Sequence, residues 1–160
     1  DMRNPSLHQM LNGKNTNGLS NYLAGEDNLD KLIYRDSQYG FDAMTAGPIP
    51  PNAAELLSST RMRELVAKLS ETYDTVIIDA PPVLGLADIP LLADSVEGVI
   101  YTIEAGGVKL KGVQAAIQRV RSSHAHIFGG IVTKVQAQNS GYGYGYAYEY
   151  SYGSKASDLA

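Results

Sequence analysis

A lone carboxylate at the end of an apolar run is the group in this sequence with the clearest chemical potential. The run, residues 75–83, reads Thr-Val-Ile-Ile-Asp-Ala-Pro-Pro-Val, and its carboxylate is Asp79. The three consecutive β-branched apolar residues predict a strand buried on both faces, because a half-exposed strand would alternate polar and apolar positions. The prolines cannot donate ladder hydrogen bonds, so we expect Asp79 at the carboxyl edge of a parallel sheet, where open α/β sheets bind ligands.

Two interpretations of Asp79 follow from this position. It could hold Mg²⁺, directly or through a water, beside a nucleotide phosphate. It could instead cap the turn or the helix that comes next. The spacing of the residues alone does not choose between the two.

Tyrosines at every second position are the other group that could do chemistry. They alternate with Gly, Ala, Glu and Ser near the C-terminus and are Tyr142, Tyr144, Tyr146, Tyr148, Tyr150 and Tyr152. The period of two is compatible with an edge strand, although the interleaved Gly and Ser weaken any strand. Low-complexity aromatic tracts also mediate self-association. Stacking on single-stranded nucleic acid would need a basic groove, and only Lys155 is near.

The same tyrosines could be phosphate acceptors, since small spacers leave the backbone mobile enough to enter an active site. The composition changes completely after Val135. We therefore predict a flexible tail over residues 136–160. The acceptor role needs support from elsewhere in the chain.

Composition limits the class of protein. With 160 residues, 44% hydrophobic content and a formal charge of −4, the chain can form one globular domain with a core. The absence of cysteine excludes disulfides and thiolate chemistry, and no apolar run is long enough to span a bilayer. The acidic balance argues against nucleic acid as a partner. The three histidines, His8, His124 and His126, lie far from any acidic cluster and do not suggest a metal site.

The elements that must position Asp79 alternate between helix and strand. Helices are expected from Asn4 with Pro5 at the first helical position, at 19–23, within 48–73 behind an Asn52–Glu55 capping box, at 89–93, and at 109–121. In the last of these regions, 109–121, we expect Leu110, Val113, Ile117 and Val120 to point inward. Strands are expected at 31–34, 41–45, 98–103 and 127–135, in addition to the Asp79 strand. This alternation predicts an α/β fold with a doubly wound, mainly parallel sheet.

Five segments together resemble the bacterial tyrosine kinases of capsule and exopolysaccharide synthesis. They are Asp-Met-Arg-Asn-Pro (1–5), Pro-Ile-Pro-Pro-Asn-Ala-Ala-Glu-Leu-Leu (48–57), Val-Ile-Ile-Asp-Ala-Pro-Pro (76–82), Gly-Ile-Val-Thr-Lys (130–134) and the tyrosine cluster. The resemblance implies a P-loop NTPase fold of the MinD and ParA type. Residues 1–135 would be the C-terminal part of the kinase domain and residues 136–160 its autophosphorylation tail.

The resemblance also implies roles for individual residues. Asp1 matches the second aspartate of the Walker A′ motif, which implies a place near Mg²⁺ and a role as base for the acceptor hydroxyl. Arg3 matches the basic residue that follows and is expected beside the ATP. Asp79 matches the Walker B aspartate, a magnesium residue, and the tail tyrosines match the autophosphorylation cluster. Thr133 stands where relatives often carry an asparagine that reads adenine, so base recognition departs from the pattern here.

The partners implied by the resemblance are ATP, Mg²⁺ and the tyrosine tails of neighbouring subunits in a homo-oligomeric ring. A polysaccharide co-polymerase membrane domain, upstream or on a separate protein, would hold the kinase at the cytoplasmic face of the bacterial inner membrane. A cognate tyrosine phosphatase would reverse the modification. The 160 residues themselves are expected to be soluble.

The chain contains no Gly-x-x-x-x-Gly-Lys-Ser/Thr motif, and Gly13-Lys14-Asn15-Thr16 lacks the upstream glycine and the spacing that cradles phosphate. We therefore interpret the sequence as a C-terminal kinase fragment that starts just after the P-loop. Two alternatives remain. One is an ATPase switch of the MinD or ParA type whose tail is only a linker, and the other is a non-catalytic partner or substrate protein.

Overall fold

The computed structural model describes residues 1–36, 40–85 and 88–135. The N-terminal half contains α1 (Leu7–Met10), α2 (Leu19–Leu23), the 3₁₀ turn η1 (Leu29–Lys31), β1 (Ile33–Asp36), β2 (Phe41–Met44), α3 (Ala53–Leu57) and α4 (Thr60–Ser70). The C-terminal half contains α5 (Asp88–Leu92), the 3₁₀ turn η2 (Ala93–Ser95), β3 (Val99–Glu104), α6 (Leu110–Ser122) and β4 (Ile127–Thr133). The six tail tyrosines lie outside the described residues.

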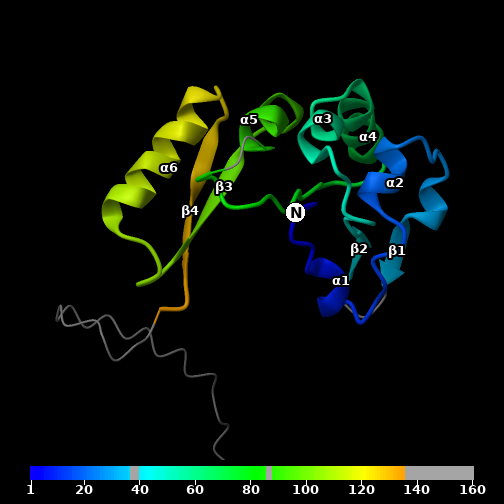
Figure 1. Cartoon of the computed structure of the whole chain (residues 1–160), viewed down its shortest axis with the longest axis horizontal. Helices are drawn as coiled ribbons and strands as arrows, with labels where there is room; N and C mark the ends of the chain where they lie inside the picture. The colour runs from blue at the N-terminus through cyan, green and yellow to red at the C-terminus, as the bar shows by residue number, and fades with distance from the viewer. Residues whose placement is uncertain (37–39, 86–87, 136–160) are drawn as a thin grey trace, which may run out of the picture.

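The described strands form two small sheets. β1 and β2 are an antiparallel pair, with Ile33 opposite Met44. β3 and β4 are parallel, with Ile103 opposite Val132, and α6 connects them across one face (Figure 1). A parallel pair joined by a crossover helix is the βαβ unit that the alternation of elements predicts.

Two clusters of buried side chains hold these elements together. The larger gathers residues of the N-terminal segment, α2, the end of η1, α3, α4 and α5. Its members are Met2, Tyr22, Leu23, Leu32, Ala53, Leu57, Met62, Leu65 and Leu92. The smaller lies under α6 and consists of Val83, Ile89, Ala116 and Val120. Ala80 packs against both clusters. The segment around residue 80, which crosses between the two halves in Figure 1, therefore joins the two cores.

Residues 75–80 do not form the strand that the sequence predicts around Asp79. Residues 75–80 belong to no hydrogen-bonded ladder among the described residues. Ile77 is 87% exposed, whereas Val76 and Ile78 are half-buried. A strand exists as a regular element only when neighbouring strands satisfy its N–H and C=O groups, and none of the described strands lies in that position. The prediction of burial on both faces is therefore wrong for this structure.

Burial is also lower than predicted elsewhere. Phe128, Ile131 and Val132 of β4 are each more than half exposed. Because Ile131 and Val132 are neighbours in the strand and point to opposite faces, both faces of β4 are incompletely covered. Leu110 is 71% exposed at the first turn of α6, although Val120, about three turns later in the same helix, is fully buried. The two sites show that an apolar period fixes the direction of a side chain, while burial also needs a partner surface.

Several helix starts differ from the prediction. α1 begins after Ser6 rather than at Pro5. The expected capping box reduces to a contact between the Asn52 and Glu55 side chains of 2.8 Å, without a side-chain cap to the backbone. A second helix, α4, starts at Thr60 after the N-cap Ser59, whose Oγ accepts from the Met62 N–H at 3.3 Å. No helix in the described part of the chain has the length and apolar character to cross a membrane.

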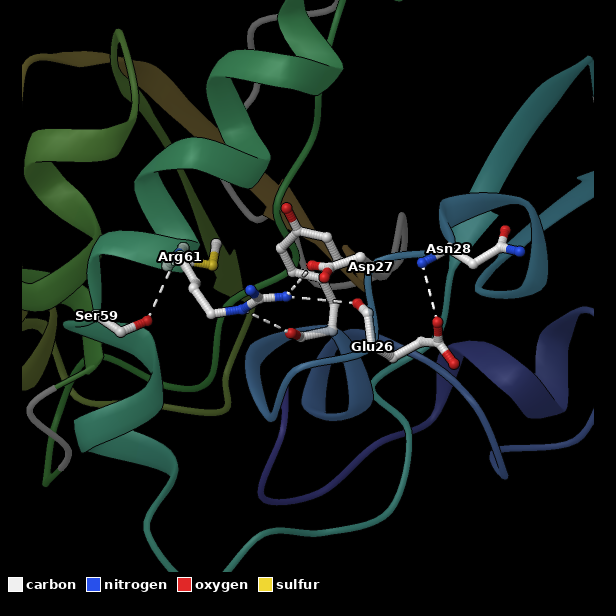
Figure 2. Close-up of polar contacts among 7 residues, drawn as sticks. Glu26, Asp27, Asn28, Ser59 and Arg61 are labelled. Atoms are coloured by element: carbon white, nitrogen blue, oxygen red, sulfur yellow. Dashed lines mark hydrogen bonds and ion pairs between the residues drawn. The ribbon is translucent and has the colours of Figure 1, made fainter.

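Arg61 fastens α4 to the end of α2. Its Nε donates to the Tyr22 carbonyl at 3.0 Å, and its Nη2 donates to the Asp27 carboxylate at 2.7 Å (Figure 2). The guanidinium carbon lies 4.7 Å from the centre of the Tyr22 ring, a cation–π distance. The hydrogen bond to Asp27 raises the pKa of Arg61, and burial opposes it. One side chain thus fixes the loop after α2 against α4.

Close backbone contacts fix the start of α2 against the chain that follows β2. The Asn15 side chain donates to the Gly47 carbonyl at 2.6 Å and accepts from the Gly47 N–H at 2.9 Å. The N–H groups of Leu19 and Ser20 donate to the carbonyls of Thr45 and Ala46 at 2.8 and 2.9 Å. Gly18 lies at this crossing with no space beside its Cα.

Gly18→Ala is expected to destabilise the fold. The added Cβ would stand 2.5 Å from the Gly47 nitrogen and still closer to the Thr45 carbonyl oxygen, both of which are backbone atoms that cannot turn aside. Overpacking of this kind costs roughly 1–3 kcal/mol. The urea-unfolding midpoint measures the loss, and Gly129→Ala is the matched control because a Cβ there meets nothing within 4 Å. Equal midpoints for the two variants would contradict this packing.

Tyr73 is expected to ionise at unusually high pH. Its hydroxyl donates to the Asp42 carboxylate at 2.6 Å, and this bond, followed by burial, raises the pKa of the phenol above its ordinary value. Because the folded pKa is the higher one, the bond contributes stability below about pH 10, and that contribution is lost as the pH rises through the folded pKa. An absorbance titration should show a late-ionising tyrosine that disappears in Tyr73→Phe and persists in Tyr34→Phe. Loss of the late phase in the Tyr34 variant would contradict the assignment.

Candidate active site

Asp1 and Asp79 lie side by side although 78 residues separate them in sequence. The Asp1 nitrogen, which is the terminal ammonium of this chain, donates to the Asp79 carbonyl oxygen at 2.8 Å and stands 3.5 Å from Asp79 Oδ2. Both residues are in segments without regular structure, the N-terminal loop and the extended segment before the two prolines. The structure thus brings together the two aspartates that the sequence singles out.

The two carboxylates are in different environments. Asp1 Oδ1 accepts from the N–H groups of Arg3 at 2.8 Å and Asn4 at 3.1 Å, so the N-terminal loop folds around this side chain. The Asp1 side chain is only 15% exposed, whereas the Asp79 side chain is 70% exposed. Asp1 is therefore an oriented carboxylate and Asp79 an accessible one.

Arg3 points away from the two aspartates to a third. Its Nε and Nη2 donate to Asp88 Oδ2 and Oδ1 at 3.0 and 2.9 Å, a bidentate pair. These hydrogen bonds, and then the negative charge of Asp88, raise the pKa of the Arg3 guanidinium. Arg3 was expected beside the ATP, and the observed contact gives its side chain a partner within the protein.

Asp88 is the residue that sequence reasoning missed. It is fully buried at the first residue of α5 and is followed by Ile-Pro-Leu-Leu. A carboxylate in the first turn of a short apolar helix is usually explained by helix capping and the macrodipole. The signal that could have found it is the cost of burying such a charge, which requires a cation from elsewhere in the chain.

Thr133 lies apart from these residues at the end of β4. It is exposed, and its hydroxyl donates to the Ile103 carbonyl at 3.4 Å. Beside it, Lys134 pairs with Glu104 at 2.9 Å and adopts a left-handed backbone with φ of 54°. In the described part of the chain no hydrogen bond joins Thr133 to Asp1 or Asp79.

The two aspartates fit the way proteins usually hold Mg²⁺. This ion takes oxygen ligands and is commonly bound through one or two carboxylates, with waters and substrate phosphates completing its shell. Asp79 offers an exposed carboxylate, and the second oxygen of Asp1 is not used by the loop hydrogen bonds. Among the described residues there is no group of three or more His, Cys, Asp or Glu that could hold a metal ion.

A groove runs beside the two aspartates. It has a volume of about 150 Å³ and is lined by the N-terminal loop, the end of β2, α4 and residues 76–79, with mostly apolar side chains. This is below the roughly 300 Å³ of typical ligand pockets. A larger cavity of about 360 Å³ lies between η1, β1 and the end of α4, near Tyr73, and none of the predicted site residues lines it. The two carboxylates that line the larger cavity, Asp27 and Asp30, are each paired with an arginine, Arg61 and Arg35. We therefore place the candidate site at Asp1 and Asp79.

The family model described as AAA domain matches residues 12–129. The tyrosine-protein kinase Etk of Escherichia coli K12 is 38% identical over 135 residues, which cover 84% of this chain and 19% of that protein. The tyrosine-protein kinase YwqD of Bacillus subtilis is 33% identical over 132 residues, which cover 82% of this chain and 56% of that protein. The chain therefore spans about a fifth of the first relative and just over half of the second.

Solved kinase domains have the same fold. The kinase domain of E. coli Etk aligns with a TM-score of 0.81 and 36% identity, covering 92% of this chain and 58% of that one. The kinase domain of VpsO aligns with a TM-score of 0.80 and 32% identity, covering 85% and 68%. These likenesses confirm the predicted P-loop NTPase class, of which the β3–α6–β4 unit is the most regular part. The chain belongs to the AAA-domain family and, within it, corresponds to part of the kinase domain of the bacterial tyrosine kinases.

Proposed function

We propose that this chain is the metal-binding part of an ATP-dependent tyrosine autokinase that phosphorylates the tail tyrosines and regulates capsule or exopolysaccharide polymerisation and export. The observation that carries the proposal is that Asp1 and Asp79, 78 positions apart in the sequence, are in contact through the Asp1 nitrogen and line the same groove. The names of its relatives support the kinase activity. We also propose that the kinase uses ATP, that a membrane domain holds it at the membrane, and that a tyrosine phosphatase reverses the modification.

The proposed reaction is transfer of the γ-phosphoryl group of ATP to a tyrosine hydroxyl. The tyrosine oxygen forms a bond to the γ-phosphorus, the bond from that phosphorus to the β-phosphate oxygen breaks, and ADP leaves. Asp1, oriented by the N–H groups of Arg3 and Asn4, accepts the proton of the hydroxyl. Asp79 and Asp1 would hold Mg²⁺, which when bound neutralises the charge on the phosphates. Positioning and charge neutralisation suffice for this chemistry, so few side chains are needed.

The phosphate cradle of this proposal lies in a longer polypeptide. The extended segment 75–80 has no ladder partner among the described residues, and its Ile77 side chain is exposed. A strand leading into a P-loop would satisfy these backbone groups and cover the apolar wall of the 150 Å³ groove. We expect the 160 residues alone to be aggregation-prone and to bind ATP negligibly, so the experiments above and below use the longer kinase that contains them.

The burial of tyrosines in the folded part supports the tail as acceptor. Tyr22 is buried under Arg61, and Tyr73 has its hydroxyl bonded to Asp42. Tyr101 packs against the smaller core. Only Tyr34, among these four, is exposed. A tail that starts after Val135 with several glycines has the reach to enter its own active site or that of a neighbour. We propose the neighbour, in a ring of subunits at the cytoplasmic face of the membrane.

Asp79→Asn and Asp1→Asn in the longer kinase should each lower tyrosine phosphorylation by about a hundredfold or more, because each removes the charge or the base without changing side-chain size. Single-turnover phosphorylation at matched Mg²⁺ measures this. Asp74→Asn is the control, since Asp74 is exposed at the start of the same extended segment. Near-normal rates in either site variant, with the fold intact, would exclude these roles.

The acceptor tyrosines should be redundant. Tyr146→Phe alone should change little, whereas replacing all six tail tyrosines by Phe should remove most of the phosphate, because neighbouring positions share the same backbone context. Phosphopeptide mapping after incubation with ATP measures this. Phosphate found mainly on Tyr34, or a tail without phosphate beside normal ATP hydrolysis, would favour an ATPase switch instead.

Phosphorylation should also loosen the assembly. Each phosphotyrosine adds roughly −1.5 to −2 charges, so six would add about −9 to −12 where tails converge. Sedimentation before and after ATP treatment should show smaller particles after modification, and the six-Phe variant should not respond. An assembly that tightens on phosphorylation would contradict the regulatory part of the proposal.

A further inference from the structure

Asp88 connects to the candidate active site through a continuous series of contacts. Both its carboxylate oxygens are bound by the Arg3 side chain, at 2.9 and 3.0 Å. The backbone N–H of the same Arg3 donates to Asp1 Oδ1 at 2.8 Å, and the Asp1 nitrogen donates to the Asp79 carbonyl at 2.8 Å. Arg3 is therefore held by α5 through its side chain while it orients Asp1 through its main chain.

The residue between them is also fixed. Met2 is 3% exposed and belongs to the larger core cluster. The N-terminal loop is thus attached at two successive residues, by apolar packing at Met2 and by the ion pair at Arg3. A loop attached at both points has little freedom to change the direction in which the Asp1 carboxylate points.

Stability alone does not explain why this anchor is charged. Burying a carboxylate has a large desolvation cost, and well-packed apolar residues in place of a buried ion pair are often neutral or stabilising. A bidentate guanidinium–carboxylate pair differs from an apolar contact in fixing both distance and orientation. Half-ångström control of a catalytic group is the situation in which such geometry matters.

From these contacts we infer that Asp88 is a positioning residue, which sets the orientation of the Asp1 carboxylate through Arg3 and thereby the metal affinity of the site. The inference rests on the proposed function for its metal. It makes a separate statement about the N-terminal loop, which holds whether or not metal is bound. Losing such an indirect contact typically weakens metal binding by about 10–100-fold.

The test compares four forms of the longer kinase that contains this chain. They are the parent, Asp88→Asn, the apolar pair Arg3→Met with Asp88→Leu, and the control Asp27→Asn. The control removes the carboxylate partner of another arginine, Arg61. Asp27 contacts Arg61 at 2.7 Å, lies away from Asp1, and has a side chain that is 80% exposed. Hydrogen exchange of the residue 2–4 amides reports loop order, Mn²⁺ titration by electron paramagnetic resonance reports affinity, and thermal melting reports stability.

Both Asp88 variants should exchange at residues 2–4 about tenfold faster or more and bind Mn²⁺ about 10–100-fold more weakly, while the control matches the parent. The apolar pair should show both the faster exchange and the weaker Mn²⁺ binding at the melting temperature of the parent. A merely structural role of the ion pair would not produce this combination. An apolar pair that melts like the parent and keeps parental exchange and Mn²⁺ affinity would overturn the inference, as would weaker Mn²⁺ binding with parental exchange.

The two proposals fail in different ways. A parent that binds no Mn²⁺ would count against the proposed function, and the exchange of residues 2–4 would still decide whether Asp88 orders the loop. A parent that binds Mn²⁺ normally, with Asp88 variants that do the same, would overturn only the role of Asp88.

Discussion

A buried carboxylate needs a cation, and this requirement fixes how the N-terminal loop meets α5. Asp88 is fully buried, and its partner Arg3 comes from a loop 85 residues earlier. The pair places the N-terminal loop against α5, and Met2 then enters the larger core while Asp1 reaches Asp79. Removal of Arg3 would leave the buried Asp88 carboxylate without a cation, and an unpaired buried charge is strongly destabilising.

The second constraint is that an extended segment becomes a strand only with a neighbour. Residues 75–80 have the composition of a central strand and join the two cores through Ala80, yet they form no ladder among the described residues. β4 is incompletely covered in the same way, since Ile131 and Val132, which point to opposite faces, are each more than half exposed. A doubly wound sheet buries both faces of its strands. Under our proposal, the remaining length of the kinase domain pairs with residues 75–80 and covers the exposed apolar side chains of β4.

Local patterns predicted elements well and burial poorly. The helix at Leu19–Leu23 matches its prediction, and α5, β3 and α6 begin within one residue of theirs, because helical periodicity and β-branched runs are properties of a short window. The predicted burial of Leu110 and of the Asp79 strand was wrong, because burial depends on a second surface that lies outside the short sequence window. Asp88 could not be assigned from its neighbours, since the residue that explains it is Arg3. The pairing of Asp1 with Asp79 was expected from the resemblance to the kinase family and not from spacing.

The central claim is that nucleotide-bound metal lies between Asp1 and Asp79. Paramagnetic broadening in the longer kinase, loaded with Mn²⁺ and a non-hydrolysable ATP analogue, tests it most directly because the effect falls steeply with distance. The account predicts the strongest broadening at the amides of residues 1–4 and 78–80. Broadening centred instead on Asp27–Asp30 and Tyr73, which line the larger cavity, with sharp signals from residues 1–4 and 78–80, would contradict it.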